Sequence, residues 1–341
     1  MTSIPKTTHA VQFFKNGGPE VLEFHEVEVA APQPDELLIK VEWAGVNFID
    51  TYFRSGIYET PKFPFTVGRE LAGTVVAVPT DPGVLESQEY KLAGIALGSK
   101  VVGYVSGAMI GYTAVKWNEV TSVPPTVGTR LAAASFVSGL TALSALRESY
   151  AVQKGDWILV HAAAGGLGLQ LVQIAKRFGA NVIGTTSTRE KSAIATAHGA
   201  DHVILYTKEN VVDRVLEITN GRGVNAIYDG VGKDTWEDDF KSIARKGTIV
   251  SLGNSSGVVP PFAPLKLTPK NLKVVRPTLM NYIATPEELF SYSKEYMALI
   301  ADGVRVPIHQ EYPFSAEGVA QAQIDLTGRG TSGKLVVKIA D

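Results

Sequence analysis

The spacing of hydrophobic residues divides the chain into two regions. Between residues 8 and 120 the hydrophobic runs are short, and several alternate with polar residues, as strands with one buried face do. Turn residues such as glycine, proline, asparagine and aspartate separate these runs. The pattern predicts a small barrel or sandwich-like domain. The expected strands are Val21–Val29, Glu36–Trp43, Ala72–Val78 and Lys100–Val105.

From about Leu131 onward, strand-like runs alternate with stretches of helical spacing. This alternation is typical of a doubly wound parallel sheet. Leu131–Leu146 is too short to span a membrane and carries several hydroxyl residues, so it predicts a buried helix. The expected strands are Trp157–His161, Val182–Gly184, His202–Tyr206, Asn225–Tyr228, Thr248–Leu252 and Leu272–Val275. Helices are expected at Lys233–Arg245 and, capped by Thr285, at Pro286–Ile300, and a last strand at Lys334–Ile339 can return to the first domain.

A glycine turn lies between the first of these strands and the helix that follows it. Small residues lead into Gly165-Gly166-Leu167-Gly168, and hydrophobic residues then recur at helical spacing as far as Phe178. Such a pattern can be an ordinary turn that needs positive φ. Because it lies inside a strand–helix–strand unit of about 30 residues, it favours a dinucleotide pyrophosphate bound at the helix N-terminus.

The end of the second strand indicates which dinucleotide binds. An NAD site usually has an aspartate or glutamate there, on the ribose 2′-hydroxyl. Here the chain reads Thr185-Thr186-Ser187-Thr188-Arg189, with no carboxylate before Glu190, and Lys191 follows. Small hydroxyls beside cationic side chains suit a 2′-phosphate, so we expect NADPH. The alternative is that Arg189–Lys191 is only a solvated helix start.

Composition excludes several classes of function. The chain has 341 residues and a net charge of −2, which gives no general attraction to nucleic acid or anionic membranes. It has no cysteine, so disulfides, thiolate catalysis and cysteine-ligated metal sites are excluded. The six histidines are scattered, none at ligand spacing. We therefore predict no metal site, and the absence of a secretory signal predicts a cytoplasmic protein.

Several local motifs match one known family. They are Asn47–Tyr52 followed by Arg54-Ser55-Gly56, then Gly68–Gly73, His161–Gly166, Tyr228–Gly232 and Gly253–Gly257. In these motifs the chain resembles the zinc-free NADPH:quinone oxidoreductases of the zeta-crystallin type, within the medium-chain dehydrogenase/reductase superfamily. The resemblance runs from about residue 9 to 340. It implies an α/β protein with a GroES-like, mainly-β catalytic domain (1–130 and 283–341) and a Rossmann NADPH-binding domain (131–282).

The same resemblance supports the absence of metal. Zinc-bearing relatives place a cysteine ligand near the position of Asn47 and a histidine within a Gly-His-Glu motif. Here that motif reads Gly68-Arg69-Glu70, so an arginine stands where the histidine ligand would be. Quinones and α,β-unsaturated carbonyls are electrophilic and accept a hydride without a Lewis acid, whereas alcohol oxidation benefits from one.

The resemblance also implies functional residues. Near the nicotinamide and the substrate it places Asn47, Asp50, Tyr52 and Tyr58, with Tyr52 as a candidate donor to a developing oxyanion. For Asp50 the alternative is a helix cap, and for Tyr58 it is simple packing. His161 is expected to be a core histidine with satisfied partners. The implied cofactor-binding residues are Asn47, Thr141, Gly165, Gly166, Leu167, Ser187, Lys191, Tyr206, Leu252, Gly253, Ser255, Arg329 and Lys334.

The resemblance implies an NADPH-dependent quinone reductase that acts as a homodimer, joined through the edge strand Leu272–Arg276. The first alternative is a 2-alkenal or enone reductase, which needs the same cofactor site. The second is an RNA-binding protein, because some zeta-crystallin relatives bind AU-rich RNA. No basic patch with interleaved aromatic residues is visible in the sequence, which counts against RNA as the main partner.

Overall fold

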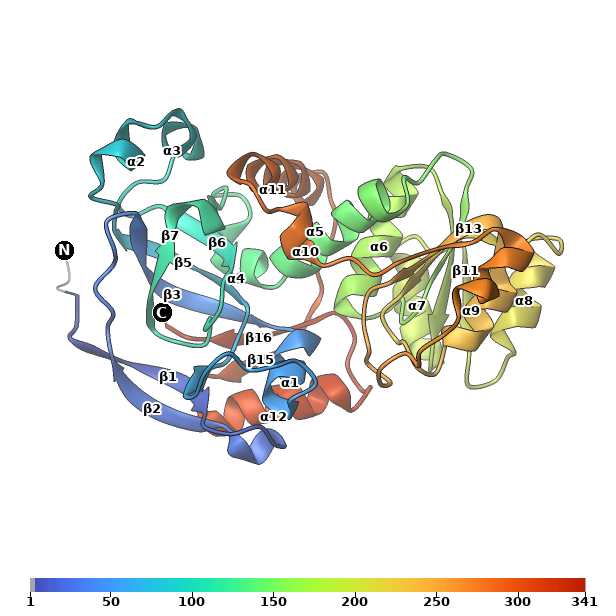
Figure 1. Cartoon of the computed structure of the whole chain (residues 1–341), viewed down its shortest axis with the longest axis horizontal. Coiled ribbons are helices and arrows are strands. Elements are labelled where there is room, and N and C mark those ends of the chain that lie inside the picture. Colours follow the sequence, from blue (N-terminus) through green and yellow to red (C-terminus); the bar gives the residue numbers. More distant parts are fainter. Residues whose placement is uncertain (1–3, 341) are drawn as a thin grey trace. The chain divides into compact units, whose positions relative to one another are not determined.

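A computed structural model describes residues 4–340, which form two compact units (Figure 1). The first unit contains the chain up to Val137, Ile283–Asp302 and the chain from Val306 onward. The second contains Ser138–Tyr282 and Gly303–Arg305. Within the described residues no helix is long and apolar enough to cross a membrane.

The first unit is built on a seven-stranded sheet in the order β15-β16-β3-β5-β6-β8, with β7 also paired to β3, and on a three-stranded sheet, β2-β1-β4. The last strand of the chain returns to this unit as expected, since β16 pairs antiparallel with β3. Its strands are β1 (Thr7–Phe13), β2 (Glu23–Glu28), β3 (Glu36–Val46), β4 (Phe65–Thr66), β5 (Glu70–Ala77), β6 (Lys100–Tyr104), β7 (Tyr112–Lys116), β8 (Val120–Ser122), β15 (Ile308–Pro313) and β16 (Lys334–Lys338).

The core of this unit includes alternating residues of β3 such as Leu37, Ile39 and Val41. The helix predicted after Thr285 is confirmed: α11 begins at Pro286 and Thr285 accepts from the Glu288 backbone N–H. The helical segments are η1 (Pro19–Val21), α1 (Phe48–Ser55), α2 (Pro82–Glu86), α3 (Gln88–Ala93), η2 (Trp117–Glu119), α4 (Gly128–Ala133), α11 (Pro286–Ala301) and α12 (Ala316–Thr327).

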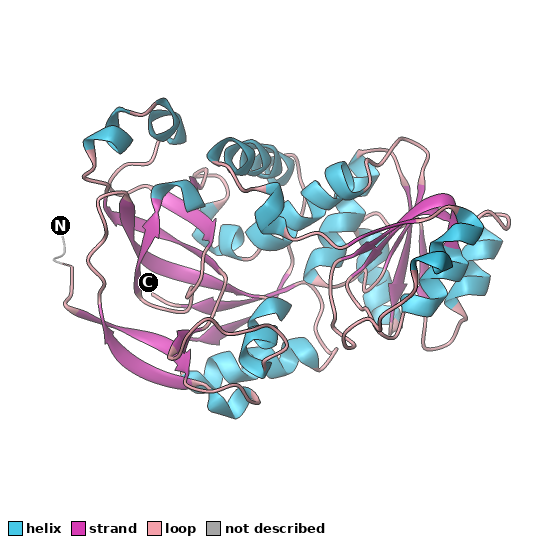
Figure 2. Ribbon diagram, viewed as in Figure 1, coloured by secondary structure: helices cyan, strands magenta, loops and turns pink. Residues whose placement is uncertain are grey.

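The second unit contains one six-stranded sheet, entirely parallel, in the order β11-β10-β9-β12-β13-β14. Numbered within the unit this is 3-2-1-4-5-6, the order of a dinucleotide-binding Rossmann fold. Figure 2 shows helices on both sides of the sheet, which leaves its strands buried on both faces. Its strands are β9 (Trp157–Val160), β10 (Asn181–Thr186), β11 (His202–Leu205), β12 (Val224–Asp229), β13 (Ile243–Ser251) and β14 (Lys273–Val275).

Two predicted helices in this part of the chain are wrong in detail. Leu131–Leu146 is not one helix, because α4 ends before Ser135, whose backbone N–H bonds to Ala132 and whose hydroxyl bonds back to Leu131. The helix predicted at Lys233–Arg245 ends at Ser242, because Ile243 already pairs with Val224 of β12. The helical segments are α5 (Phe136–Ser144), η3 (Ala145–Ser149), α6 (Gly166–Arg177), α7 (Arg189–Ala197), α8 (Val211–Ile218), α9 (Trp236–Ser242), η4 (Pro264–Lys270) and α10 (Leu279–Tyr282).

Candidate functional site

The start of α1 carries two of the predicted site residues. Asn47 is the N-cap of this helix, and its backbone N–H donates to Asp50 Oδ2 at 2.8 Å. Gly56 ends the helix in the left-handed region, at φ 81°. The cap role weighed for Asp50 is therefore present in the structure, since its carboxylate satisfies an N–H group that the helix leaves unpaired.

Asp50 is also an electrostatically unusual group. Its side chain is buried, with 3% of the residue exposed, and Oδ1 has no hydrogen-bond partner among the residues the structure describes. Burial raises the pKa of Asp50 from an ordinary value of 3.8 to about 7, although the Asn47 N–H, Lys334 and Arg69 oppose this rise. Asp50 can thus hold a proton near neutral pH.

A buried ion pair lies beside this helix start. Glu70, at the first position of β5, is fully buried, and its carboxylate lies 2.9 Å from Lys334 Nζ at the first position of β16. Asn47 joins the two, since its amide donates to Glu70 Oε2 at 2.8 Å and its carbonyl oxygen accepts from Lys334 Nζ. Gly45 makes room for the carboxylate, because a Cβ there would lie 2.2 Å from Glu70 Oε2.

Aromatic side chains pack beside these charged residues. Tyr52 is buried, and its ring meets the ring of Tyr58 edge-on at 5.3 Å. Tyr58 also meets the Phe53 ring at 5.7 Å, and the Arg69 guanidinium lies over that Phe53 ring at 4.2 Å. The packing role weighed for Tyr58 is therefore present. It places a half-buried phenol next to Tyr52.

Sequence reasoning missed two residues of this group. Burial raises the pKa of Tyr104, at the end of β6, and Asp50, Tyr58 and Glu70 raise it further while Arg69 lowers it. Tyr104 therefore lies within electrostatic range of the predicted residues. In the sequence, the Gly68-Arg69-Glu70 motif indicated a role only for Arg69, at the position of the missing histidine ligand. A carboxylate at the start of a buried strand was the one available sign that Glu70 needed a cationic partner.

In the second unit, most predicted cofactor residues follow the carboxyl ends of the parallel strands. The ends of parallel strands meet at one edge of a sheet, where ligands of this fold bind. After β9 come Gly165, Gly166 and Leu167; after β10, Ser187 and Lys191; after β11, Tyr206; after β13, Leu252, Gly253 and Ser255. Thr141 lies on α5, and Arg329 is exposed in the loop before β16, both outside this edge.

The glycine turn has the geometry that an anion needs. Gly165 is the N-cap of α6 and provides no side-chain cap, so the N–H groups of the first helical turn are open to an external acceptor. Gly168 allows a close approach, because a Cβ there would lie 2.3 Å from the Ala162 carbonyl oxygen. Ala162 itself has a positive φ of 51°. The turn is thus closely packed where Gly168 meets the Ala162 carbonyl oxygen, and it leaves the N–H groups at the start of α6 accessible to a ligand.

The region after β10 is compatible with a phosphate. Thr188 caps α7 through the backbone N–H of Lys191, which puts Lys191 in the first helical turn. Burial lowers the pKa of the Lys191 ammonium. A nearby phosphate would oppose that effect, since an opposite charge favours the charged form. Thr207 bonds to the Ser187 carbonyl and so ties the loop after β11 to this region.

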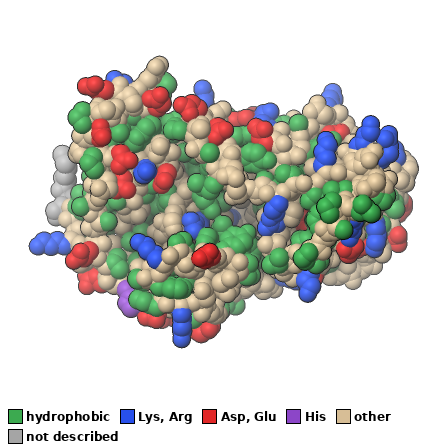
Figure 3. Space-filling model, in the orientation of Figure 1, with side chains coloured by type: hydrophobic (Ala, Val, Ile, Leu, Met, Phe, Trp, Pro, Cys, Tyr) green, Lys and Arg blue, Asp and Glu red, His purple; other side chains and the backbone are tan. Residues whose placement is uncertain are grey.

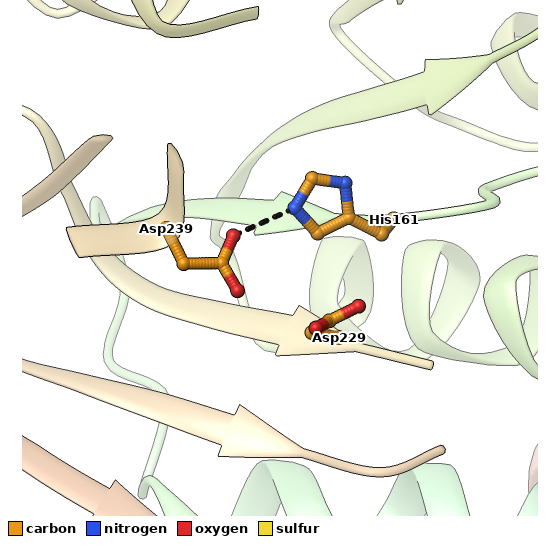
Figure 4. A group of neighbouring side chains, drawn as sticks. All are labelled: His161, Asp229 and Asp239. Carbon is orange, nitrogen blue, oxygen red and sulfur yellow. Dashed lines mark hydrogen bonds and ion pairs between the residues drawn. The ribbon is translucent and has the colours of Figure 1, made fainter. Parts of the chain in front are cut away.

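Three buried polar residues lie close together: His161, Asp229 and Asp239 (Figure 4). His161 Nε2 lies 2.9 Å from Asp239 Oδ1, and His161 Nδ1 lies 3.1 Å from Thr185 Oγ1. The prediction of a satisfied core histidine is confirmed. Spacing along the chain gave no sign of the grouping, because folding brings together residues that lie far apart in sequence.

Two family models match the chain. The alcohol dehydrogenase GroES-like domain matches residues 33–125, and the zinc-binding dehydrogenase family matches residues 166–296. A quinone oxidoreductase of Pseudomonas aeruginosa is 39% identical over 332 residues, covering 96% of this chain and 98% of that protein. A 2-haloacrylate reductase of Burkholderia is 32% identical over 341 residues, covering 96% of this chain and 98% of that protein.

A solved structure gives the same result. The crystal structure of Escherichia coli quinone oxidoreductase complexed with NADPH has a TM-score of 0.90 to this chain at 38% identity, and covers 97% of this chain and 99% of that one. By identity and coverage, the chain belongs to the quinone oxidoreductases of the medium-chain dehydrogenase/reductase superfamily.

Proposed function

We propose that this protein is an NADPH-dependent quinone reductase, which transfers a hydride to quinones without a metal. The observation that carries the proposal is the similarity, over nearly the whole chain, to a quinone oxidoreductase whose structure contains NADPH. The parallel sheet and its open glycine turn are the parts of the fold that such a cofactor requires.

The cofactor is assigned to the strand ends of the second unit. When bound, NADPH supplies the hydride. The backbone of Gly165, Gly166 and Leu167 holds the pyrophosphate, and Ser187, Lys191 and Tyr206 hold the 2′-phosphate and adenine. We assign Thr141, Leu252, Gly253, Ser255, Asn47, Arg329 and Lys334 to the nicotinamide half. With these roles, the second unit is the cofactor domain and the first unit is the catalytic domain. The boundary expected between residues 130 and 131 lies before the division between the units at Val137 and Ser138.

The substrate is assigned to the residues at the start of α1. Negative charge collects on the substrate oxygen as the hydride arrives, and a donor aimed at that oxygen lowers the barrier. Tyr52 is our first choice of donor, with Tyr58 packed against it. Asp50 is a second proton store, because burial raises its pKa to about 7. Asn47 positions the Lys334 ammonium through its carbonyl oxygen.

The residues present do not fit a zinc site. Zinc prefers cysteine, histidine and carboxylate ligands, but Asn47 and Arg69 stand where the relatives carry ligands. The Arg69 guanidinium is held over the Phe53 ring, and the Glu70 carboxylate already binds the Lys334 ammonium. A zinc ion would have to displace that ammonium from a fully buried carboxylate. We therefore propose that the reaction proceeds without metal.

A substrate panel tests the function. NADPH oxidation should be fast with ortho- or para-quinones and should give the two-electron hydroquinone. Tyr52→Phe should lower turnover on alkenals by about 10²–10³, and on quinones by less, because the aromatic hydroquinone product needs less help. Tyr90→Phe is a matched control, since its buried hydroxyl donates to the nearby Ile95 carbonyl oxygen at 3.0 Å. Equal activity of Tyr52→Phe and wild type on both substrate classes would refute the donor role.

One observation favours a second function. The Burkholderia relative is a 2-haloacrylate reductase, so the same scaffold supports reduction of an activated alkene. A 2-alkenal or enone reductase would use the same cofactor residues and differ only in the substrate pocket. Higher kcat/KM on alkenals than on any quinone would favour this alternative.

We also propose a cytoplasmic homodimer, joined at β14. This strand is the edge of the parallel sheet and, within the described chain, hydrogen-bonds only to β13. Exposed hydrophobic residues Val258, Leu265 and Met280 lie near it in sequence. Figure 3 shows hydrophobic side chains gathered over the η4 segment that precedes the strand. A second copy pairing with β14 would cover a bare edge.

A further inference from the structure

His161, Asp229 and Asp239 are of the residue types that bind metal ions, and they form one buried cluster. Each residue offers one ligand atom, and these atoms lie within 4.8 Å of one another. Asp229, however, already accepts bonds from the Val231 and Gly232 backbone and from Thr235 Oγ1 at 2.9 Å. His161 and Asp239 are spaced for a hydrogen bond to each other. A metal would have to break these contacts, so we assign the cluster another role.

The His161 side of the cluster reaches the glycine turn through Thr185, near the end of β10. Thr185 Oγ1 lies 3.1 Å from His161 Nδ1 and accepts from the Ala162 backbone N–H at 3.3 Å. Asp239, on α9, holds the far nitrogen of the same ring at 2.9 Å. All three side chains are at least nine-tenths buried. A continuous chain of contacts therefore runs from α9 to the backbone of Ala162.

Ala162 is the residue that gives the glycine turn its shape. Its φ of 51° lies in the left-handed region, which an alanine adopts only at a steric cost. Its carbonyl oxygen accepts from the Gly165 N–H at 2.9 Å and packs closely against Gly168. The conformation of Ala162 therefore decides where the first turn of α6 points its N–H groups. A strained residue persists only where its surroundings fix it.

We propose that Thr185, His161 and Asp239 are positioning residues for the cofactor, which hold Ala162 in its left-handed conformation and thereby set the affinity of the glycine turn for NADPH. This inference rests on the proposed function, because that function places the pyrophosphate on the turn. The three side chains act through Ala162. Their effect belongs to cofactor binding and not to hydride transfer.

The test is Thr185→Val, which removes the hydroxyl and keeps the shape of the side chain. The Kd for NADPH, measured by calorimetry, should rise about tenfold, the effect of losing one buried hydrogen bond. The Kd for NADH should rise by the same factor, since both cofactors share the pyrophosphate. The kcat at saturating NADPH should stay at the wild-type value. Thr185→Ser keeps a hydroxyl and should restore the affinity.

Thr248→Val is the matched control. Thr248 is also a buried threonine of the parallel sheet, on β13, but its hydroxyl has no partner among residues 4–340. The control should bind NADPH as the wild type does. His161→Phe provides a second route, since it should weaken NADPH to a similar extent, and combining it with Thr185→Val should add little because both act through one chain of contacts.

The inference would be overturned if Thr185→Val bound NADPH with the wild-type Kd. It would also be overturned if Thr185→Ser failed to restore the Kd, or if Thr185→Val lowered only kcat. Full additivity of Thr185→Val and His161→Phe would also overturn it. A wild-type protein that binds no NADPH would overturn the proposed function itself, which distinguishes the two failures.

Discussion

Replacing Asp50 with asparagine should change how the free energy of unfolding depends on pH. Burial raises the pKa of Asp50 from 3.8 to about 7. Between these values the folded protein keeps a proton on Asp50 that the unfolded chain has released. The free energy of unfolding therefore falls as pH rises through this window, and the loss is complete above about pH 7. Asparagine does not titrate, so the variant lacks this loss.

The size of the effect follows from the same window. One proton per pH unit is worth about 1.4 kcal/mol, and the window covers about three pH units, so the full loss is about 4 kcal/mol. The substitution preserves the local geometry. In the wild type the Asn47 N–H donates to Asp50 Oδ2 at 2.8 Å, and the amide oxygen of asparagine can accept the same bond. Relative to wild type, Asp50→Asn should gain about 1.4 kcal/mol per pH unit up to about pH 7 and then level off.

Urea denaturation of both proteins from about pH 4.5 to pH 8 measures this difference, and the subtraction cancels the other titrating groups. Asp213→Asn is the matched control, because Asp213 holds the same third position in α8 but is exposed. Parallel pH curves for wild type and Asp50→Asn would refute the reasoning. So would a wild type that gains on the variant as pH rises, because the Asp50 charge would then be stabilised by Lys334 and Arg69.

Four further predictions concern the cofactor, the metal, the assembly and the ion pair. Lys191→Ala should raise the Kd for NADPH about tenfold or more and leave NADH nearly unaffected, with the exposed Lys241→Ala as control; equal losses would contradict the assignment. Exhaustive chelation should leave turnover unchanged and elemental analysis should find no stoichiometric zinc, whereas activity lost with a bound metal would contradict metal-free chemistry. Val274→Pro, which removes a ladder donor, should dissociate or unfold the dimer seen by sedimentation, and a wild-type monomer at micromolar concentration would refute the interface. Lys334→Met should lower the free energy of unfolding by about 3–5 kcal/mol, because it leaves the buried Glu70 carboxylate unpaired, and adding Glu70→Gln should recover much of this loss. An unchanged free energy of unfolding in Lys334→Met would contradict this prediction.

The features predicted correctly from the sequence are local ones. The strand and helix of the glycine turn lie within about 30 residues, so periodicity and glycine placement were enough to predict them, and the parallel sheet followed from repetition of the same unit. Side chains that partner across the fold were not predictable in this way. Lys334 and Asn47 are 287 positions apart, and His161 and Asp239 are 78 apart.

The errors have local physical causes that composition does not show. The predicted helix Leu131–Leu146 breaks because the Ser135 hydroxyl bonds to the Leu131 carbonyl, which is an alternative to the regular helix that a hydrophobicity pattern cannot register. Residues after Ser242 favour a helix by pattern but pair in the parallel sheet, so tertiary context overrides propensity there. Tyr104 has no motif around it, and only its position at the end of β6 brings it near the predicted site residues.

The charges at the start of α1 explain how Asp50 holds a proton near neutral pH. Lys334 is committed to Glu70 by an ion pair of 2.9 Å and to Asn47 by a hydrogen bond, so it offers Asp50 only a longer-range attraction. Arg69 is similarly held over the Phe53 ring. Burial therefore outweighs both cations, and Asp50 keeps its proton near neutral pH. The start of α1 thus contains a fixed ammonium and a carboxyl group whose pKa of about 7 keeps it mostly protonated below neutral pH. In the proposed reaction, a protonated carboxyl group here is a proton source for the oxyanion that hydride transfer creates, whereas the Lys334 ammonium is already paired with Glu70.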